Sequence, residues 1–186
     1  MSARVPDPHA PGAHSPLARP FSARPFERVD HVDPRDRVVA RGGRTGGAAG
    51  GPLKGYAATV CSDRAGRVLL HRRVPSARVC PDHHDVLIGG AVRTGEGYRA
   101  AALRELREEP GRTEAPGPTG AYRVRADDPH DASFLTVRRW TADRPPRPGP
   151  REIARRGFVA PLTVAMGGHT SPVPAGTEAV RRLFPL

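Results

Sequence analysis

Three acidic residues, Glu105, Glu108 and Glu109, stand close together near the middle of the chain. They belong to the stretch 97–109, which is rich in Ala, Leu, Glu and Arg and contains no β-branched residue, a composition typical of a helix. Because a helix turns about 100° per residue, the three carboxylates would project from one face. Carboxylates gathered in this way can bind a metal ion or act as an acid or a base.

This predicted face is unfavourable without a positively charged partner. Carboxylates three and four residues apart repel, and the C-terminal end of a helix disfavours anions by about 0.3–1 kcal/mol each. Arg104 borders the face, but an Arg that precedes its Glu by four residues is the weaker orientation. A hard divalent cation would offset the repulsion, because Mg²⁺ and Mn²⁺ prefer carboxylate, water and phosphate oxygens. The residues alone leave two interpretations open, a solvated face or a site for Mg²⁺ or Mn²⁺.

The segments on both sides of the helix predict a mixed sheet. Short apolar or alternating runs bounded by turn residues are typical of strands, and the last residues, 175–184, predict a second helix. Strands before and after a central helix favour an α/β sandwich. The predicted strands are 56–61, 68–71, 85–88, 121–126 and 133–140, with a hairpin in 26–44 around the turn 33–36 and another turn at 63–66.

Local signals predict how the central helix is attached. Gly89 and Gly90 are expected to end the short strand before it. Thr94 or Glu96 would cap its first turn. Leu103 and Leu106 would point away from the carboxylates, toward the core.

Composition predicts one folded domain with a disordered tail. The 186 residues include 22 Pro and 21 Gly, so the ordered part should be shorter than the chain. Residues 1–25 are rich in Pro, Ala, Arg and Ser without periodicity and are expected to be disordered, and 42–52 would be a flexible connector. The domain is therefore expected at 26–186.

The charge and the cysteines limit the partners and the location. The formal net charge is +11, but the arginines are scattered and do not form a stripe with aromatic residues, which argues against a nucleic-acid partner. A positive surface would still attract phosphorylated small molecules. Only Cys61 and Cys80 are thiols, and no run approaches the roughly 20 apolar residues of a membrane helix. We expect a cytoplasmic protein that does not span a membrane.

The residues from Gly90 onward resemble the signature box of the Nudix hydrolases. The match comprises Gly90, Glu96, Arg104-Glu105-Leu106, Glu108-Glu109 and Gly111, and it fails only at the last fixed position, where Arg112 replaces an apolar residue. The order of the predicted elements is also similar to that family, whose fold is an α/β/α sandwich with a mixed sheet.

This resemblance implies hydrolysis of a diphosphate bond in a nucleoside diphosphate derivative or a related organic diphosphate. Glu108 and Glu109 would be the principal ligands of Mg²⁺ or Mn²⁺, and Glu105 a further ligand or the base that takes a proton from water. The carbonyl of Gly90 would complete the coordination. The resemblance also allows a homodimer.

Further residues are assigned roles by the resemblance or by their own positions and chemistry. Arg104 would orient the carboxylates, with Glu96 as its partner. Arg72 and Arg73 would contact substrate phosphate or be solvated charges. Pro110 disfavours helical geometry at the preceding residue, Glu109, so it would either shift the helix end or impair the metal site. A further acidic ligand would be Asp127, Asp128 or Glu152.

Two alternatives arise from the same residues. The segments 27–41 and 151–159 are similar to a Nudix branch allied to isopentenyl diphosphate isomerases, but the chain has Ile88 and Gly90 where those isomerases need Cys and His. Zinc binding by Cys80, His83 and His84 lacks a fourth ligand at a suitable spacing. A catalytically impaired module that binds nucleotide or RNA remains the competing function.

Overall fold

A computed structural model gives the fold and describes most of the chain beyond residue 26. The described residues are 27–43, 52–77, 80–108, 119–126, 133–142, 153–167, 174–184 and 186. The tail 1–25 and most of the connector 42–52 lie outside them. The elements are β1 (Arg28–Val32), β2 (Val38–Gly43), β3 (Leu53–Ser62), β4 (Val68–Arg73), β5 (His84–Asp85), β6 (Leu87–Ala91), α1 (Tyr98–Glu108), β7 (Thr119–Ala126), β8 (Ser133–Thr141), β9 (Ile153–Val159), α2 (Pro161–Ala165) and α3 (Pro174–Leu183).

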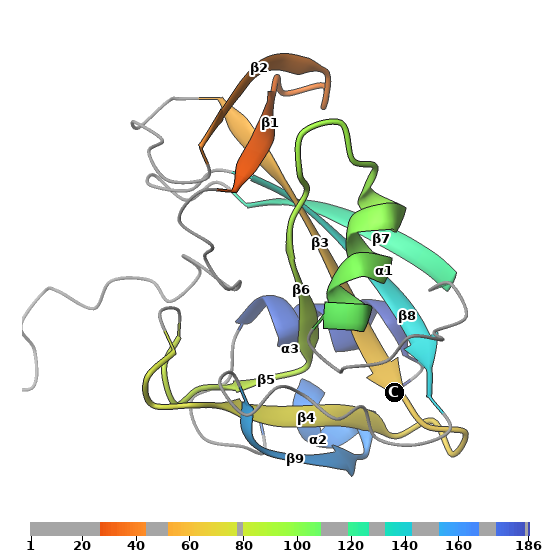
Figure 1. Cartoon of the computed structure of the whole chain (residues 1–186). Helices are drawn as coiled ribbons and strands as arrows, with labels where there is room; N and C mark the ends of the chain where they lie inside the picture. The colour runs from red at the N-terminus through yellow and green to blue at the C-terminus, as the bar shows by residue number, and fades with distance from the viewer. Residues whose placement is uncertain are drawn as a thin grey trace, which may run out of the picture.

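Strand β3 is the centre of a mixed sheet formed by the described strands (Figure 1). It pairs in parallel with β8 from Lys54 to Ser62 and antiparallel with β6 from Tyr56 to Val60. All residues of β3 are buried, since elements cover both of its faces. A strand covered on both faces does not need alternating polar residues, which explains the mostly small and apolar residues that follow Lys54 in this strand.

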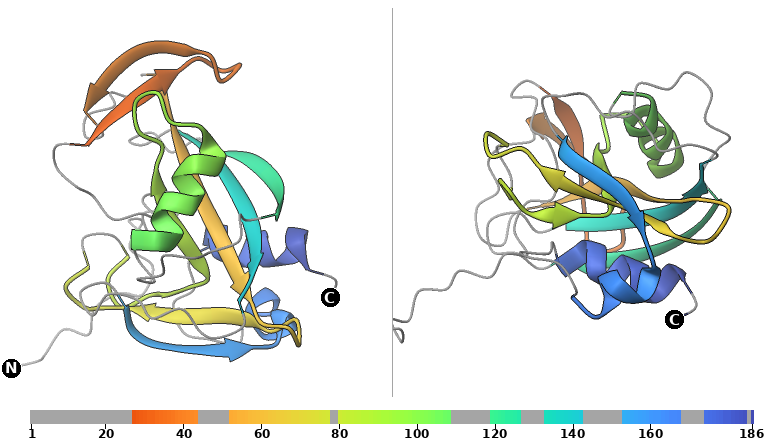
Figure 2. Two further views of the ribbon diagram at one scale, coloured as in Figure 1. Left: turned by 45° about the vertical axis from the view of Figure 1, so that its right-hand side comes forward. Right: turned by 90° about the horizontal axis from the view of Figure 1, so that it is seen from below.

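The helices cover opposite faces of this sheet, as the view from below in Figure 2 shows. Helix α1 packs on one face, and α2 and α3 pack on the other. The predicted α/β sandwich with a mixed sheet is therefore confirmed. The core under α1 contains Cys61, Leu69, Ile88, Leu106 and Trp140, and the core under α2 and α3 contains Val60, Val137, Val164, Val180 and Phe184.

The predicted N-terminal hairpin is confirmed as β1 and β2, and it docks beside the loop before α1. The turn is held by Asp33, whose carboxylate accepts bonds from the backbone N–H groups of Arg35 at 2.8 Å and Arg37 at 3.0 Å. The backbone N–H of Thr94 donates to the carbonyl of Arg28 at 3.0 Å. The hairpin is thus joined to the segment that carries the box residues.

The short strand predicted at 85–88 differs from the observed one. It is broken at Val86 because Asp85 Oδ1 accepts bonds from the N–H groups of Val86 at 2.7 Å and Leu87 at 2.9 Å. The two glycines do not end the strand, since β6 continues to Ala91. A Cβ on Gly89 would lie 2.6 Å from the Cα of Ala58, so glycine permits the close pairing of β6 with β3.

Two elements were not predicted, β9 and α2. Strand β9 pairs antiparallel with β4 along most of its length, at an edge of the sheet where its central residues are exposed.

Among the described residues, no helix is long and apolar enough to cross a membrane.

Candidate active site around Arg104

Arg104 on α1 is the centre of a network of charged side chains. Its Nε donates to Glu96 Oε1 at 2.9 Å, and its Nη2 donates to Glu96 Oε2 at 2.9 Å. The same Nη2 also donates to the carbonyl oxygen of Ala91 at 2.9 Å. Its side chain is only 15% exposed. These bonds attach α1 both to the loop before it and to the end of β6.

Glu105 lies on the buried side of α1, against β6. It is 8% exposed, and Arg104 Nη1 donates to its Oε1. A Cβ at Gly90 would lie 2.6 Å from the carboxyl carbon of Glu105, so the glycine leaves the space that this carboxylate fills. Burial raises the pKa of Glu105; Arg104 opposes the shift, and the carboxylates of Glu108 and Glu27 add to it.

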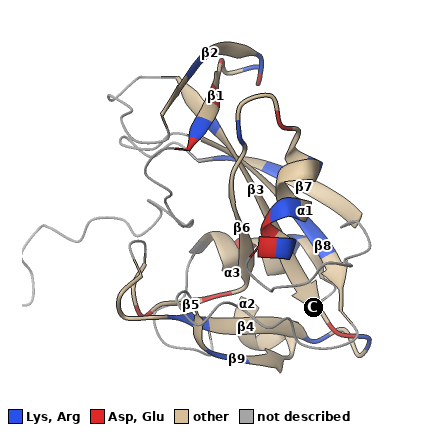
Figure 3. Cartoon of the chain, in the orientation of Figure 1, with Lys and Arg blue, Asp and Glu red and all other residues tan. Residues whose placement is uncertain are grey.

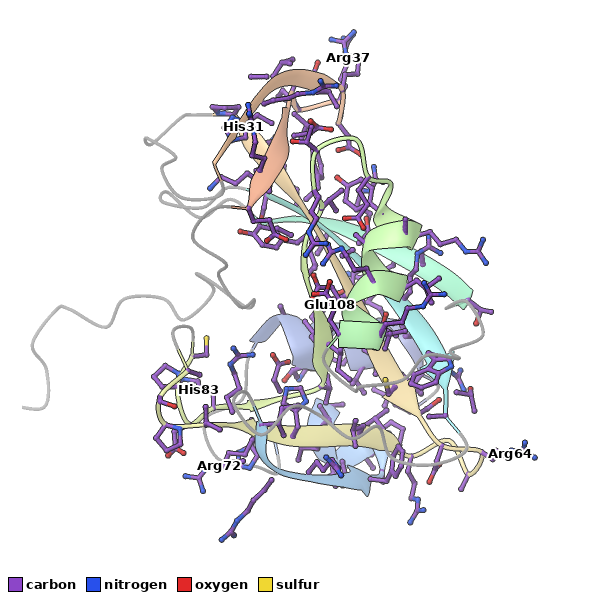
Figure 4. The ribbon with its side chains drawn as sticks, in the orientation of Figure 1. His31, Arg37, Arg64, Arg72, His83 and Glu108 are labelled. Atoms are coloured by element: carbon purple, nitrogen blue, oxygen red, sulfur yellow. The ribbon has the colours of Figure 1, made fainter. Side chains whose placement is uncertain are left out.

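Glu108 stands one turn further along and is more accessible, with 31% of its side chain exposed. Its carboxylate lies 3.8 Å from Arg104 Nη1 and 3.4 Å from Arg93 Nη2. Figure 3 shows acidic and basic residues alternating over this end of α1, and Figure 4 shows Glu108 at the same end of the helix.

Two residues of this network escaped the sequence analysis, Glu27 and Arg93. Arg93 Nε donates to Glu27 Oε1 at 2.7 Å, and the backbone N–H of Arg93 donates to Glu96 Oε2 at 3.0 Å. Since Glu27 precedes β1, it reaches the site only through the docking of the hairpin. No local pattern in the sequence signals a contact between residues so far apart.

The donor set is compatible with a hard divalent cation. The carboxylates of Glu105 and Glu108 and the backbone at Gly90 offer oxygen, which Mg²⁺ and Mn²⁺ prefer. Over the part of the chain that the structure describes, no three His, Cys, Asp or Glu side chains converge on a ready-made metal position. The position of Glu109, which lies outside the described residues, relative to this pair stays a prediction.

Comparison with known proteins decides the family. Residues 53–174 match the NUDIX domain. The chain belongs to the Nudix family. An uncharacterized Nudix hydrolase of Streptomyces coelicolor is 34% identical over 165 residues, which cover 84% of this chain and 88% of the relative. This chain is accordingly a Nudix hydrolase.

Solved structures of other proteins agree with this assignment. A crystal structure from Deinococcus radiodurans is similar at a TM-score of 0.66 and 26% identity, covering 86% of this chain and 100% of that one. The Escherichia coli dihydroneopterin triphosphate pyrophosphohydrolase is similar at a TM-score of 0.52 and 14% identity, covering 70% and 96%. At that identity the second likeness concerns the fold alone.

Arg72 and Arg73 of this Nudix hydrolase lie on opposite faces of β4, as neighbours on a strand must. Arg72 Nη2 donates to Asp82 Oδ2 at 2.5 Å, and Arg73 is buried. Figure 4 shows Arg72 and His83 beside β5, apart from Glu108. The structure therefore does not bring Arg72 into the Arg104 network, and a contact of either arginine with substrate stays a prediction.

Buried polar groups continue along the strands next to Arg73. Burial lowers the pKa of His71 to about 3, with Arg73 and His84 adding to the shift, so this imidazole is neutral near pH 7. Burial raises the pKa of Asp85 to about 6, although the bonds from the backbone N–H groups of Leu87 and Val86 favour its ionised form. Among the described residues, no group of three His, Cys, Asp or Glu side chains that could hold a metal ion is found, and the exclusion of zinc from Cys80, His83 and His84 stays a prediction.

The prediction for Leu103 is wrong, and one of the two predicted caps of α1 is excluded. Leu106 is in the core as expected, but Leu103 is only half-buried, and Ala101 and Ala102 take the core positions instead. The hydroxyl of Thr94 has no hydrogen-bond partner within the described residues, so it does not cap the helix.

The remaining predicted site residues lie outside the described part of the chain. Their roles stay predictions: Glu109, Pro110, Gly111, Arg112, Asp127, Asp128 and Glu152.

Proposed function

We propose that this Nudix hydrolase is metal-dependent and cleaves the diphosphate bond of a nucleoside diphosphate derivative or a related organic diphosphate. The observation that carries the proposal is the buried carboxylate of Glu105, held against Gly90 by Arg104 with Glu108 one turn away. Carboxylates whose pKa is shifted by burial beside a specific charged partner concentrate at functional sites.

Glu105, Glu108, Glu109 and the carbonyl of Gly90 would hold Mg²⁺ or Mn²⁺. The oxygen donors favour these two ions over zinc, which prefers nitrogen and sulfur ligands. When bound, such a cation would neutralise part of the diphosphate charge and lower the pKa of bound water.

Glu105 is also suited to accept a proton from the attacking water. A carboxylate is a better general base when its pKa lies nearer to the working pH, and burial moves the pKa of Glu105 in that direction. Arg104 keeps this carboxylate oriented toward β6. Glu96 fixes Arg104 in turn through two bonds of 2.9 Å, so the pair acts by positioning and need not touch the substrate.

The substrate is proposed to be a small anionic molecule. The formal charge of +11 would attract a diphosphate from solution, and Arg73 on β4 is a candidate for phosphate contact. A cytoplasmic location and a homodimer remain predictions.

Turnover with and without metal tests this function. The purified protein is incubated with a panel of nucleoside diphosphate derivatives and with Mg²⁺, Mn²⁺ or a chelator, and product release is measured. We expect release that requires a divalent ion and falls about 100-fold or more in Glu108→Gln. Glu178→Gln is the matched control, because Glu178 forms a similar 2.7 Å pair with Arg182 on α3, on the opposite face of the sheet.

The competing function gives a different result in the same assay. A module that only binds nucleotide or RNA would retain a ligand of the panel without releasing product, and its binding would not change in Glu108→Gln. That outcome would overturn the hydrolytic proposal.

A further inference from the structure

Glu27 is a carboxylate from outside the box that lies inside its charged network. Its side chain is 8% exposed although it precedes the first strand. Strand β1 places it there, because Val29 is fully buried and forms a β-bridge with Arg93. An acidic side chain buried at this position needs a partner, and Arg93 provides it at 2.7 Å.

Arg93 is shared unequally between two carboxylates. Its Nε bond to Glu27 Oε1 is 2.7 Å long, whereas its Nη2 lies 3.4 Å from Glu108 Oε1. The shorter and more buried contact is therefore with Glu27. Because Glu27 already balances the charge of the Arg93 guanidinium, Arg93 attracts the carboxylate of Glu108 less strongly. The negative charge of Glu108 is then less compensated by Arg93.

The charge balance of the network points the same way. The described side chains that bond to one another comprise the four carboxylates of Glu27, Glu96, Glu105 and Glu108 and the two guanidiniums of Arg93 and Arg104. Among these side chains the carboxylates outnumber the guanidiniums, four against two, and this negative excess attracts a cation. Without Glu27 the excess would fall to one, and Arg93 would pair more closely with Glu108.

We infer that Glu27 is a positioning residue of the metal site, which holds Arg93 so that Glu108 stays available to the cation. The inference rests on the proposed metal-dependent function and assigns to the N-terminal hairpin a part in completing the site. Glu27 acts through Arg93 and is not itself a ligand.

Mn²⁺ binding without substrate tests this role. Titration followed by the electron paramagnetic resonance of free Mn²⁺ gives Kd for the wild type and for Glu27→Gln, Arg93→Gln and the double variant. We expect Glu27→Gln to raise Kd about tenfold, because Arg93 then competes with the cation for Glu108. Removing Arg93 as well should return Kd to within about threefold of the wild type, since the net charge is restored.

The double variant separates a charge effect from a structural one. If Glu27 only fastened the hairpin, the double variant would bind Mn²⁺ as weakly as Glu27→Gln, and the inference would be overturned. A wild-type Kd in Glu27→Gln would also overturn it. Glu178→Gln removes an acidic charge from a more exposed pair of the same 2.7 Å length on α3 and should leave Kd unchanged; an equal rise there would show a general charge effect and contradict the inference.

Failure of this inference is distinguishable from failure of the proposed function. If the wild type binds Mn²⁺ and loses turnover in Glu108→Gln, but Glu27→Gln binds as the wild type does, only the role of Glu27 is wrong. If the wild type retains no Mn²⁺, the proposed function and this inference fail together.

Discussion

Glu96 and Glu105 bond to the same guanidinium, yet their pKa values move in opposite directions. Both carboxylates contact Arg104, one from the loop before α1 and one from the buried side of the helix. Burial would raise the pKa of Glu96, but the bonds from Arg104 and from the N–H of Arg93 outweigh it and hold the pKa below its usual range. Burial raises the pKa of Glu105, and Arg104 does not compensate.

The number of bonds and the nearby charges explain this difference. Both oxygens of Glu96 accept bonds from Arg104, and one accepts a further bond from a backbone N–H at 3.0 Å. Glu105 has two acidic neighbours, Glu108 and Glu27, which favour its protonated form. One arginine thus supports an anchor whose ionised form is favoured, Glu96, and a carboxylate whose pKa is raised, Glu105. This contrast is what a positioned general base requires.

Replacing the carboxylate that exchanges protons should have the largest effect. We expect Glu105→Gln to lower kcat about 10²- to 10⁴-fold, the range of a lost general base, without loss of stability. The amide fills the same space beside Gly90 and removes a charge whose burial is unfavourable. Single-turnover rates and urea unfolding measure the two quantities. A variant that unfolds more readily than the wild type would show that Glu105 is structural.

Replacing Glu96, the anchor, should lower both activity and stability. The loss of activity should be smaller than in Glu105→Gln. Glu96→Gln weakens two charge-assisted bonds to Arg104, so we expect unfolding to become easier by about 1–3 kcal/mol and kcat/KM to fall about 10- to 100-fold. The exposed Glu178–Arg182 pair provides the comparison, because Glu178→Gln should change stability by less than about 1 kcal/mol. Equal losses in the two variants would mean that the network around Arg104 has no special role.

The pH dependence of stability should differ in sign between the two sites. The folded pKa of Glu96 is lowered, so its contribution is present above the ordinary carboxyl pKa and is lost as pH falls through the folded value. The folded pKa of Glu105 is raised, so its ionisation reduces stability as pH rises from the ordinary carboxyl pKa through the folded value.

Unfolding free energies across the acidic range check this prediction without metal. The unfolding free energy of the wild type minus that of Glu96→Gln should increase with pH. The corresponding difference for Glu105→Gln should decrease with pH. Two slopes of the same sign would remove the distinction between anchor and base.

Much of this site could be predicted because its residues are local in sequence. Helix α1 and the loop before it contain Glu96, Arg104, Glu105 and Glu108, and helical periodicity together with a family signature relates them. The observed bond between Arg104 and Glu96 lies within this segment. The α/β sandwich could be predicted for the same reason, since most of its strands and the helices α1 and α3 have a local pattern of their own.

The unpredicted parts depend on contacts between distant segments. Glu27 meets Arg93, 66 residues later, only because β1 docks on the loop before α1. Strand β9 has exposed arginines at its centre and lacks apolar alternation, so only its pairing with β4 identifies it. The break at Val86 arises because the side chain of Asp85 accepts bonds from the two following N–H groups, a local competition with strand pairing that the apolar run did not reveal.

The smallest effect is expected at the far end of α1, where a contact supports the helix without touching either carboxylate. Tyr98 donates its hydroxyl to Asp36 Oδ1 at 2.7 Å, and the guanidinium carbon of Arg123 lies 4.5 Å from the centre of its ring. Tyr98→Phe removes the bond but retains the ring, so we expect a stability loss of about 0.5–1.5 kcal/mol and kcat within about twofold of the wild type.

Tyr122→Phe is the control for Tyr98→Phe, because Tyr122 lies on β7 and packs against the core on the other face of the sheet. The pKa values of Glu96 and Glu105 shift in opposite directions because of burial and of contacts that all lie within the Arg104 network. Loss of the Tyr98 hydroxyl should therefore not change how the unfolding free-energy differences for Glu96→Gln and Glu105→Gln depend on pH. These differences are measured again with Tyr98→Phe present in every protein compared. If either slope shifts, the start of α1 sets the position of the carboxylates, and the explanation by local bonds is wrong.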